Sequence, residues 1–153
     1  MLFQQILSDL TKAMKEKDAV RVSAIRMLIS SIRNKEIALL KKDAGLSDEE
    51  VIHVIRSEVK KRKEAAEEFE KGGRHEMAES ELTEAQILEV YLPAELSDDE
   101  LHVLVKEAIR ESGATGEKDF GKAMKSAQAA VKGRALGERV AEMVRGELRS
   151  NVS

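Results

Sequence analysis

"ILEVYLPAELSDDEL" spans residues 87–101 and contains Pro93, the only proline of the 153-residue chain. Proline lacks a backbone N–H and disfavours a helical residue before it, so a helix arriving from the N-terminal side must end here. Ser97 and Glu100 then have the spacing of a capping box, which starts a new helix. This segment predicts a boundary between an N-terminal unit, residues 1–93, and a C-terminal unit, residues 94–153.

The composition on both sides of this boundary is that of an all-α protein. Hydrophobic residues make up 42% of the chain, enough for a core, while aromatic residues make up only 3%. Ala, Leu, Glu, Lys, Arg and Val dominate, and most of them are good helix formers. The chain has no cysteine, which excludes disulfides, thiolate zinc sites and a cysteine nucleophile.

Apolar residues three and four apart predict seven helices. Four precede Pro93, over residues 2–14, from 22 to near the turn at residues 43–45, 47–71 and 78–92; the third begins at a second capping box and ends at two consecutive glycines. Three shorter helices follow, over residues 97–112, 118–132 and 136–148. We therefore expect an N-terminal bundle of about four helices and a small C-terminal three-helix unit.

"GEKDFGKA", residues 116–123, is one residue away from a phosphate-binding P-loop. Ala123 stands where that loop needs a hydroxyl to hold Mg²⁺, and the preceding residues have helical rather than strand periodicity. These glycines and lysines therefore do not predict a nucleotide site, and we expect no cofactor.

The balance of charge changes within residues 118–149. This stretch has four acidic side chains against eight basic ones: Lys118, Lys122, Lys125, Lys132, Arg134, Arg139, Arg145 and Arg149. At about 100° per residue the four lysines fall within roughly 80° of one helix face, opposite the apolar residues. Such a face is either a solvated surface or a phosphate-contacting one, which Lys132-Gly133-Arg134 would extend.

Few aromatic side chains are available to stack on bases, so reading of single strands is disfavoured. A nucleic-acid partner would instead be a folded RNA, such as tRNA, recognised by its shape and backbone. We expect no DNA partner.

"KDFGKAMK" (118–125), "VKGRALGERV" (131–140) and the opening stretch resemble consecutive signatures of the GatB/YqeY family. "RVSAIRMLISSIRNKEI" (21–37) and "KKRKEAAEEFEKGGRHEMAESE" (60–81) resemble its stand-alone members. The resemblance implies a multihelical N-terminal unit and a C-terminal unit similar to the tRNA-contacting tail of the amidotransferase B subunit. In some bacteria a similar domain is attached to glutaminyl-tRNA synthetase.

The resemblance also implies a candidate RNA surface. Its motifs match Lys118, Gly121 and Lys122, and then Lys132, Gly133 and Arg134; Lys125 and Arg139 complete the predicted site. Ala129, Leu136 and Ala141 depart from the family pattern, which puts a polar contact at 136 or 141 in doubt. The family label implies carbon–nitrogen ligase activity with glutamine as the amido-nitrogen donor. The catalytic body of the amidotransferase is outside the resemblance, so we expect association with that system, no catalytic residues and no catalysis by this chain alone.

Three weaker features are given ordinary interpretations. Glu50 and His53 have a Glu-x-x-His spacing, but a di-iron site needs a second such motif, so no metal is expected. "KKRKEAAEEFEK" predicts a solvated helix with Glu58–Arg62 and Lys63–Glu67 pairs, or else an extension of the RNA footprint. Tyr91 is predicted to pack at the boundary, with its hydroxyl bonded near the interdomain turn.

Two functions remain open from the sequence. One is a tRNA-binding accessory protein whose N-terminal bundle engages an aminoacyl-tRNA synthetase or amidotransferase subunits. The other is a helical protein–protein adaptor without RNA binding. With no signal peptide and no apolar run of eighteen residues, we expect no membrane partner and a cytoplasmic location.

Overall fold

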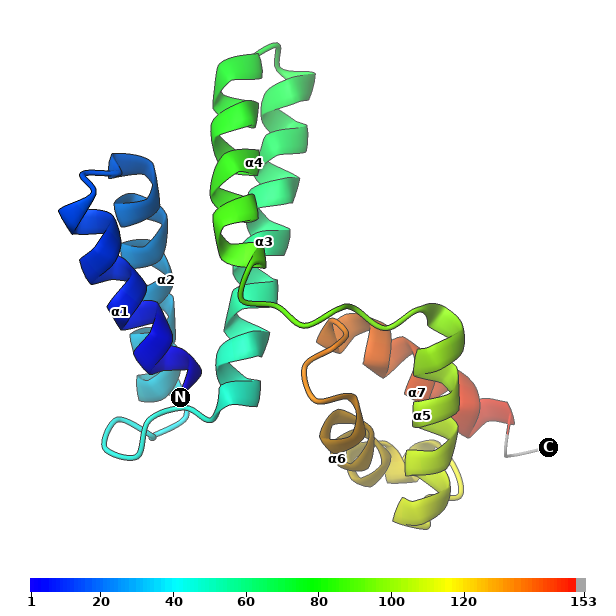
Figure 1. Ribbon diagram of the computed structural model, residues 1–153. Coiled ribbons are helices and arrows are strands. Elements are labelled where there is room, and N and C mark those ends of the chain that lie inside the picture. The colour runs from blue at the N-terminus through cyan, green and yellow to red at the C-terminus, as the bar shows by residue number, and fades with distance from the viewer. Residues whose placement is uncertain (151–153) are drawn as a thin grey trace. The chain divides into compact units, whose positions relative to one another are not determined.

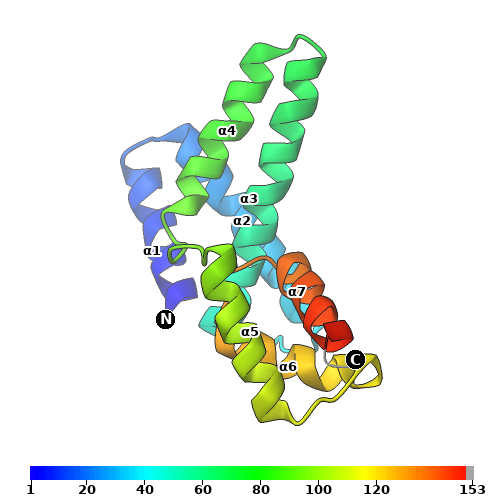
Figure 2. The same ribbon diagram turned by 90° about the vertical axis from the view of Figure 1, so that its right-hand side faces the viewer.

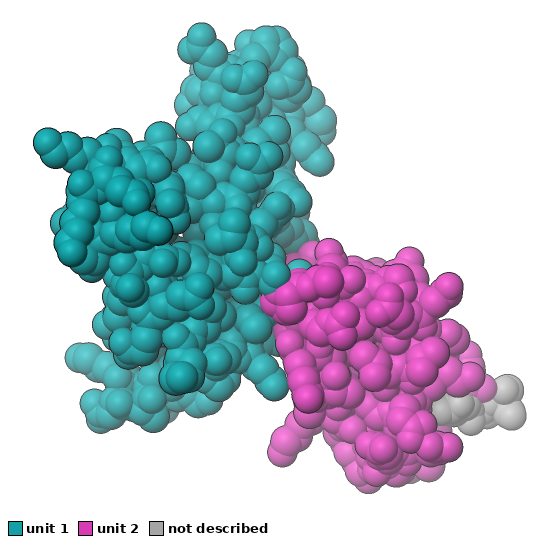
Figure 3. All heavy atoms as spheres, in the orientation of Figure 1, with its two compact units in different colours: residues 1–92 teal, residues 93–153 magenta. Residues whose placement is uncertain are grey.

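The computed structural model describes residues 1–150, which form two compact units, residues 1–92 and the residues from Pro93 onward (Figure 3). Within these residues the secondary structure is entirely helical, with seven α-helices and one short 3₁₀ helix. The all-α prediction is confirmed.

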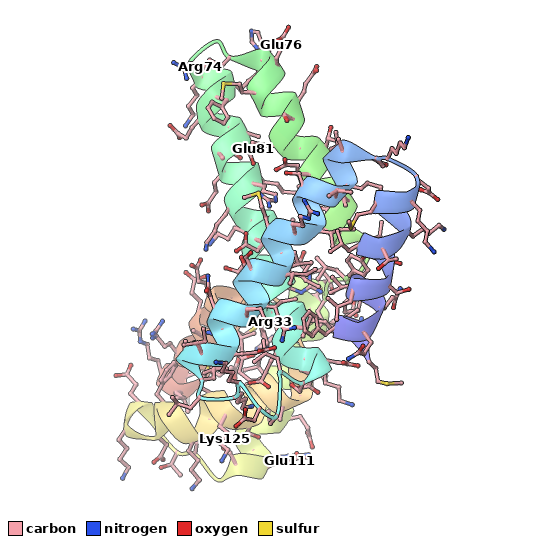
Figure 4. All side chains as sticks on the ribbon, turned by 90° about the vertical axis from the view of Figure 1, so that its left-hand side faces the viewer. Arg33, Arg74, Glu76, Glu81, Glu111 and Lys125 are labelled. Atoms are coloured by element: carbon pink, nitrogen blue, oxygen red, sulfur yellow. The ribbon has the colours of Figure 1, made fainter. Side chains whose placement is uncertain are left out.

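The N-terminal unit consists of two antiparallel helical hairpins (Figure 1). Helices α1 (Leu2–Lys15) and α2 (Ala19–Ala38) form the first hairpin, and α3 (Asp48–Lys71) and α4 (His75–Glu89) form the second. Helix α2 packs on both α3 and α4, and α1 contacts α3. Figures 1 and 2 show the turn between α3 and α4 projecting beyond the turn between α1 and α2, and Figure 4 labels Arg74 and Glu76 at this projecting end.

The core of this unit is aliphatic. Its buried members are Ile6, Ile25, Leu28, Ile32, Val51, Val54, Ile55, Val59, Ala85, Leu88 and Tyr91. Some apolar residues of the predicted helices do not belong to it, since Met14 is 49% exposed, Leu39 41% and Leu82 43%. Helical periodicity thus identifies the buried face but overestimates its width, at the ends of α1 and α2 and also in the middle of α4. Helix α2 ends at Ala38, before the predicted turn at residues 43–45, and Leu40 has a φ of 57°.

Helix α3 starts as predicted. The Ser47 hydroxyl accepts a hydrogen bond from the Glu50 N–H, and the Glu50 carboxylate accepts one from the Ser47 N–H, which completes a capping box. Helix α4 ends at Glu89, three residues before the predicted end at Leu92. Because Leu92 precedes Pro93, its backbone is disfavoured from helical geometry, and the chain leaves the helix through a turn.

Tyr91 is buried, but its hydroxyl does not bond near the boundary turn, so that prediction is wrong. It donates to Asp9 Oδ2 of α1 at 2.5 Å. Burial and the Asp9 carboxylate together raise the pKa of Tyr91 above its ordinary value. This contact joins α1 to the turn that follows α4 in the N-terminal unit.

The C-terminal unit contains α5 (Asp98–Ser112), the 3₁₀ helix η1 (Glu117–Asp119), α6 (Phe120–Val131) and α7 (Gly137–Ser150). The three α-helices contact one another pairwise. Helix α6 contributes small residues, Ala123 and Ala127, to the buried core, so its backbone can approach those of α5 and α7 closely.

The predicted capping box at Ser97 is only half formed. The Ser97 hydroxyl accepts from the Glu100 N–H, and the Glu100 carboxylate accepts from that hydroxyl in place of the Ser97 N–H that a capping box requires. Ser97 is still the N-cap of α5.

Candidate nucleic-acid interface

The segment before α6 is a tight turn and not part of the helix. Asp119 Oδ2 accepts hydrogen bonds from the Thr115 N–H at 2.9 Å and from the Thr115 hydroxyl at 3.2 Å. These bonds, the backbone one foremost, lower the pKa of Asp119. Lys118 therefore lies in η1, and the prediction of one continuous helix over residues 118–132 is wrong at this end.

The same prediction is wrong at the other end. Lys132 has a φ of 52° and Gly133 a φ of 74°, so both backbones are left-handed and α6 ends at Val131. Glycine adopts this conformation at little cost, which explains Gly133 at the start of the turn. The single helix face therefore comprises Lys122 and Lys125, with Lys118 in the preceding turn and Lys132 at the C-cap.

The lysines of this region are exposed, and none of them takes part in an ion pair among the described residues of the C-terminal unit. Lys106, Lys118, Lys122, Lys125 and Lys132 are exposed, and the ion pairs between described residues of this unit all use arginine or histidine. Their ammonium groups are therefore available to an external anion.

Two glycines of the predicted site differ in their surroundings. Gly121 is exposed in the first turn of α6, where a Cβ would meet no atom within 4 Å, whereas Gly133 is buried in the turn after the helix. Nearby, a Cβ placed on Gly113 would lie 3.7 Å from Lys122 Nζ. Lys122 thus extends toward the C-terminal end of α5, where the helix dipole favours a cation.

Arg139 is engaged within the unit. Its guanidinium donates to Glu95 Oε1 and Asp98 Oδ1, each at 2.8 Å, and to the Leu96 carbonyl at 3.1 Å. Hydrogen bonding to Asp98 is the largest cause of the raised pKa of Arg139. Its place in the RNA surface stays a prediction, but the contacts observed are structural.

Arg134 also holds the entry segment of the unit. Its Nε donates to the Ala94 carbonyl at 3.1 Å, and its own carbonyl accepts from the Leu96 N–H at 2.8 Å. The backbone after Pro93 is thereby fixed to the turn between α6 and α7.

Two further arginines have partners that the sequence did not reveal. Arg145 lies over the Phe120 ring, 4.8 Å from its centroid, and Arg149 Nε donates to Glu117 Oε1 at 2.8 Å. Each contact joins residues more than twenty positions apart, so no local spacing indicates it. The positions that depart from the family pattern offer no polar group: Ala129 is exposed, and Leu136 and Ala141 are half-buried.

Helix α3 uses its basic residues differently. Lys60 pairs with Glu64, Lys61 with Glu58, Lys63 with Glu89 of α4, and Lys71 with Glu68. Arg62 is only 6% exposed and faces Glu81 and Glu84 of α4, at 3.9 and 3.4 Å. Figure 4 labels Glu81 on this hairpin. The predicted Glu58–Arg62 and Lys63–Glu67 pairs are thus wrong, because Arg62 and Lys63 turn toward α4.

Glu50 and His53 do not form part of a metal cluster in the described chain. Lys41 Nζ donates to both Glu50 carboxylate oxygens, at 2.8 and 2.9 Å. Residues 1–150 contain no group of three or more His, Asp or Glu side chains placed to hold a metal ion. Nor do they contain a helix with the length and apolar character needed to span a membrane.

Residues 3–148 match the model of a family described as Yqey-like protein. Similar relatives include "Altered inheritance of mitochondria protein 41, mitochondrial" from Lachancea thermotolerans, 42% identical over 85 residues, which cover 55% of this chain and 44% of the relative. The protein of the same name from Kluyveromyces lactis is 40% identical over 86 residues, 56% of this chain and 45% of the relative. The alignments thus span a little under half the length of these relatives.

Proposed function

The chain belongs to the Yqey-like protein family, and on that premise we propose that it binds folded tRNA through its C-terminal unit. The observation that carries the proposal is the set of exposed lysines at α6 that form no ion pair with a carboxylate in the described chain. We define Lys118, Lys122, Lys125 and Lys132 as the α6 lysine surface.

Unpaired ammonium groups suit a polyanion. Each lysine that reaches a phosphate releases condensed counterions, and this release supplies most of the sequence-independent affinity for nucleic acid. Helix α6 contains no Asp or Glu between Phe120 and Val131. The carboxylate of Asp119, at its N-cap, attracts Lys118 and Lys122 but forms no ion pair with them, and it does not act on Lys125.

The aromatic residues favour recognition of RNA shape over base stacking. Arg145 covers Phe120, Arg33 lies over the Phe3 ring, and Tyr91 is buried. Stacking platforms for single strands need exposed rings. A folded RNA such as tRNA, contacted along its backbone, fits these surroundings better than an unstructured strand.

The choice of tRNA rests on the sequence resemblance of residues 118–140 to the tail of the amidotransferase B subunit. We propose accordingly that the protein is an accessory factor of the aminoacyl-tRNA system, with a synthetase or an amidotransferase subunit as its protein partner. Its place of action would be the cytoplasm; the names of the yeast relatives place those proteins in mitochondria.

Binding of the intact protein to unfractionated tRNA across a salt series tests this proposal. We expect log affinity to fall linearly with log salt, and a single Lys125→Ala change to reduce the slope by about 0.7–0.9 if Lys125 contacts one phosphate. Lys106→Ala is the matched control, because Lys106 is an exposed lysine of the same unit outside the surface. Its slope should equal that of the unmodified protein.

Affinity that does not depend on salt, or equal slopes for the two variants, would refute the α6 lysine surface as the contact. Absence of tRNA binding altogether would favour the adaptor function, in which the lysines are only solvated.

A further inference from the structure

A second candidate site lies in the N-terminal unit, in a groove between α2 and α3 with a volume of about 380 Å³. This volume is within the range of small-molecule sites, about 300–1,000 Å³. The lining residues are Ser31, Asn34, Lys35 and Ala38 from α2 and His53, Val54, Ser57, Glu58 and Lys61 from α3.

The groove exists because short side chains face each other there. Ser31 and Ala38 lie seven residues apart on α2, which places them on one helix face, and Ser57 lines the groove from α3. Val54 is only 8% exposed and supplies an apolar wall. The longer side chains of Lys35 and Lys61 stand at the exposed edge of this hollow.

Hydrogen-bond donors outnumber acceptors in the groove. Glu58 is the one carboxylate among the lining residues, and it accepts from the Ser31 hydroxyl at 2.9 Å and lies 3.8 Å from Lys61 Nζ. Lys35, Asn34 and Ser57 retain donors for a ligand. The groove is thus suited to a group with several acceptor oxygens and a negative charge.

His53 supplies a further hydrogen-bond donor to the groove, and its pKa would respond to the charge of a bound ligand. Burial is the largest cause of its lowered pKa, and the nearby Arg56 and Lys35 cations lower the pKa further, while Glu49 and Glu50 raise it. The imidazole is therefore neutral at pH 7 and carries one N–H donor. An anion in the groove would favour the protonated ring and raise the pKa of His53.

We propose that this groove binds the phosphate group of a small phosphomonoester. Phosphate presents three or more acceptor oxygens to the lysine, amide, hydroxyl and imidazole donors, whereas a carboxylate presents only two. The inference concerns the N-terminal unit and is independent of the proposed tRNA function. Since RNA also carries phosphate, the two sources must be separated by experiment.

Titration of inorganic phosphate into the intact protein at pH 7 and constant ionic strength tests the proposal, with the ring protons of the three histidines followed by NMR. We expect saturable shifts for His53 and none for His75 and His102, which are exposed and lie outside the groove. Lys35→Ala should weaken binding about tenfold, the loss of one charge-assisted hydrogen bond. Lys12→Ala, at an exposed lysine of α1, should have no effect.

Ala38→Leu provides a test without a change of charge. Ala38 is exposed, so the larger side chain should fill the groove and abolish the His53 response while the fold, checked by circular dichroism, is kept. A titration from pH 5 to 8 should give a higher pKa for His53 in sodium sulfate than in sodium chloride of equal ionic strength. Equal values, parallel shifts of all three histidines, or binding retained by Ala38→Leu would overturn the proposal.

A tRNA titration separates the two sources of phosphate. We expect Lys35→Ala and Ala38→Leu to leave tRNA affinity unchanged, because the groove takes a small ligand. Loss of tRNA binding in both variants, without any response to free phosphate, would assign the groove to the RNA backbone and refute the small-molecule site.

Discussion

Helices α3 and α6 are both rich in lysine, but they differ in what surrounds the ammonium groups. Each lysine of α3 lies within 4.0 Å of a glutamate, on α3 itself or on α4. The lysines of α6 form no ion pair in the described chain: α6 contains no acidic residue, and Asp119 at its N-cap attracts Lys122 without pairing with it. A basic segment is therefore a candidate anion site only where no carboxylate of the folded chain pairs with its basic side chains.

Arginine and lysine have separate tasks in the C-terminal unit. The arginines donate to carbonyls and carboxylates or lie on an aromatic ring, as Arg134, Arg139, Arg145 and Arg149 do. The planar guanidinium is suited to such fixed, multiple contacts, whereas a lysine ammonium is a mobile point charge. In the proposed function, the lysines and not these arginines therefore supply the contacts to RNA.

Among the substitutions that test this difference between α3 and α6, we expect the largest loss of stability at Arg62 of α3. Arg62→Met removes the buried cation that faces Glu81 and Glu84 and leaves their half-buried carboxylates without it. We expect unfolding to become easier by about 3 kcal/mol, as when one partner of a buried pair is removed. Urea denaturation monitored by circular dichroism measures the free energy of unfolding. A decrease of less than about 0.5 kcal/mol would show that the charge of Arg62 does not stabilise the packing of α3 on α4.

A smaller effect is expected at Arg139. Arg139→Gln removes the contacts to Glu95, Asp98 and the Leu96 carbonyl, at a cost of about 1 kcal/mol because the pairs are partly exposed. The salt slope of tRNA binding should not change if Arg139 acts only within the unit. A reduced slope with unaltered stability would place Arg139 in the RNA surface and weaken the division between arginine and lysine.

The smallest effect concerns Lys41 and Glu50 at the start of α3. The hydrogen bond from Lys41, followed by that from the Ser47 N–H, lowers the pKa of Glu50 below its ordinary value. A carboxyl with a lowered folded-state pKa adds stability above its unfolded pKa, and that stability is lost as pH falls through the folded-state pKa.

Glu50→Gln isolates this charge, since glutamine also fits the capping box. We expect the variant to be less stable by under about 1 kcal/mol at pH 7. The difference should shrink as pH falls below about 4.3, the unfolded value. Denaturation midpoints of both proteins at pH 7, 5 and 3 provide the measurement; a difference that grows on acidification would contradict it.

Much of the fold could be predicted because its signals are local. Apolar spacing indicated all seven helices, and Pro93, the glycine pair at 72 and 73 and the Ser47 capping box marked their ends. The predictions were wrong where contacts between distant residues determine the partner of a side chain. Arg62 and Lys63 turn to α4, and Tyr91 reaches Asp9, 82 positions away.

The sequence identified the lysines of the candidate site but not the backbone geometry that positions them. The lysines were found because charge is visible in the sequence, but η1 and the left-handed Lys132 interrupt the expected helix. The internal contacts of Arg139 were missed because Glu95 and Asp98 lie more than forty positions away. The groove between α2 and α3 was also missed, since it depends on which helix faces meet.

The most direct test compares tRNA binding by two matched triple variants across the same salt series. One is Lys122→Gln/Lys125→Gln/Lys132→Gln in the α6 lysine surface, and the other is Lys60→Gln/Lys61→Gln/Lys63→Gln in α3, both checked for folding by circular dichroism. We predict that the first lowers the salt slope by about two to three, at 0.7–0.9 per contact, and that the second leaves it unchanged. Equal slopes for the two variants, or a larger loss in the α3 variant, would contradict the assignment of RNA binding to the α6 lysine surface.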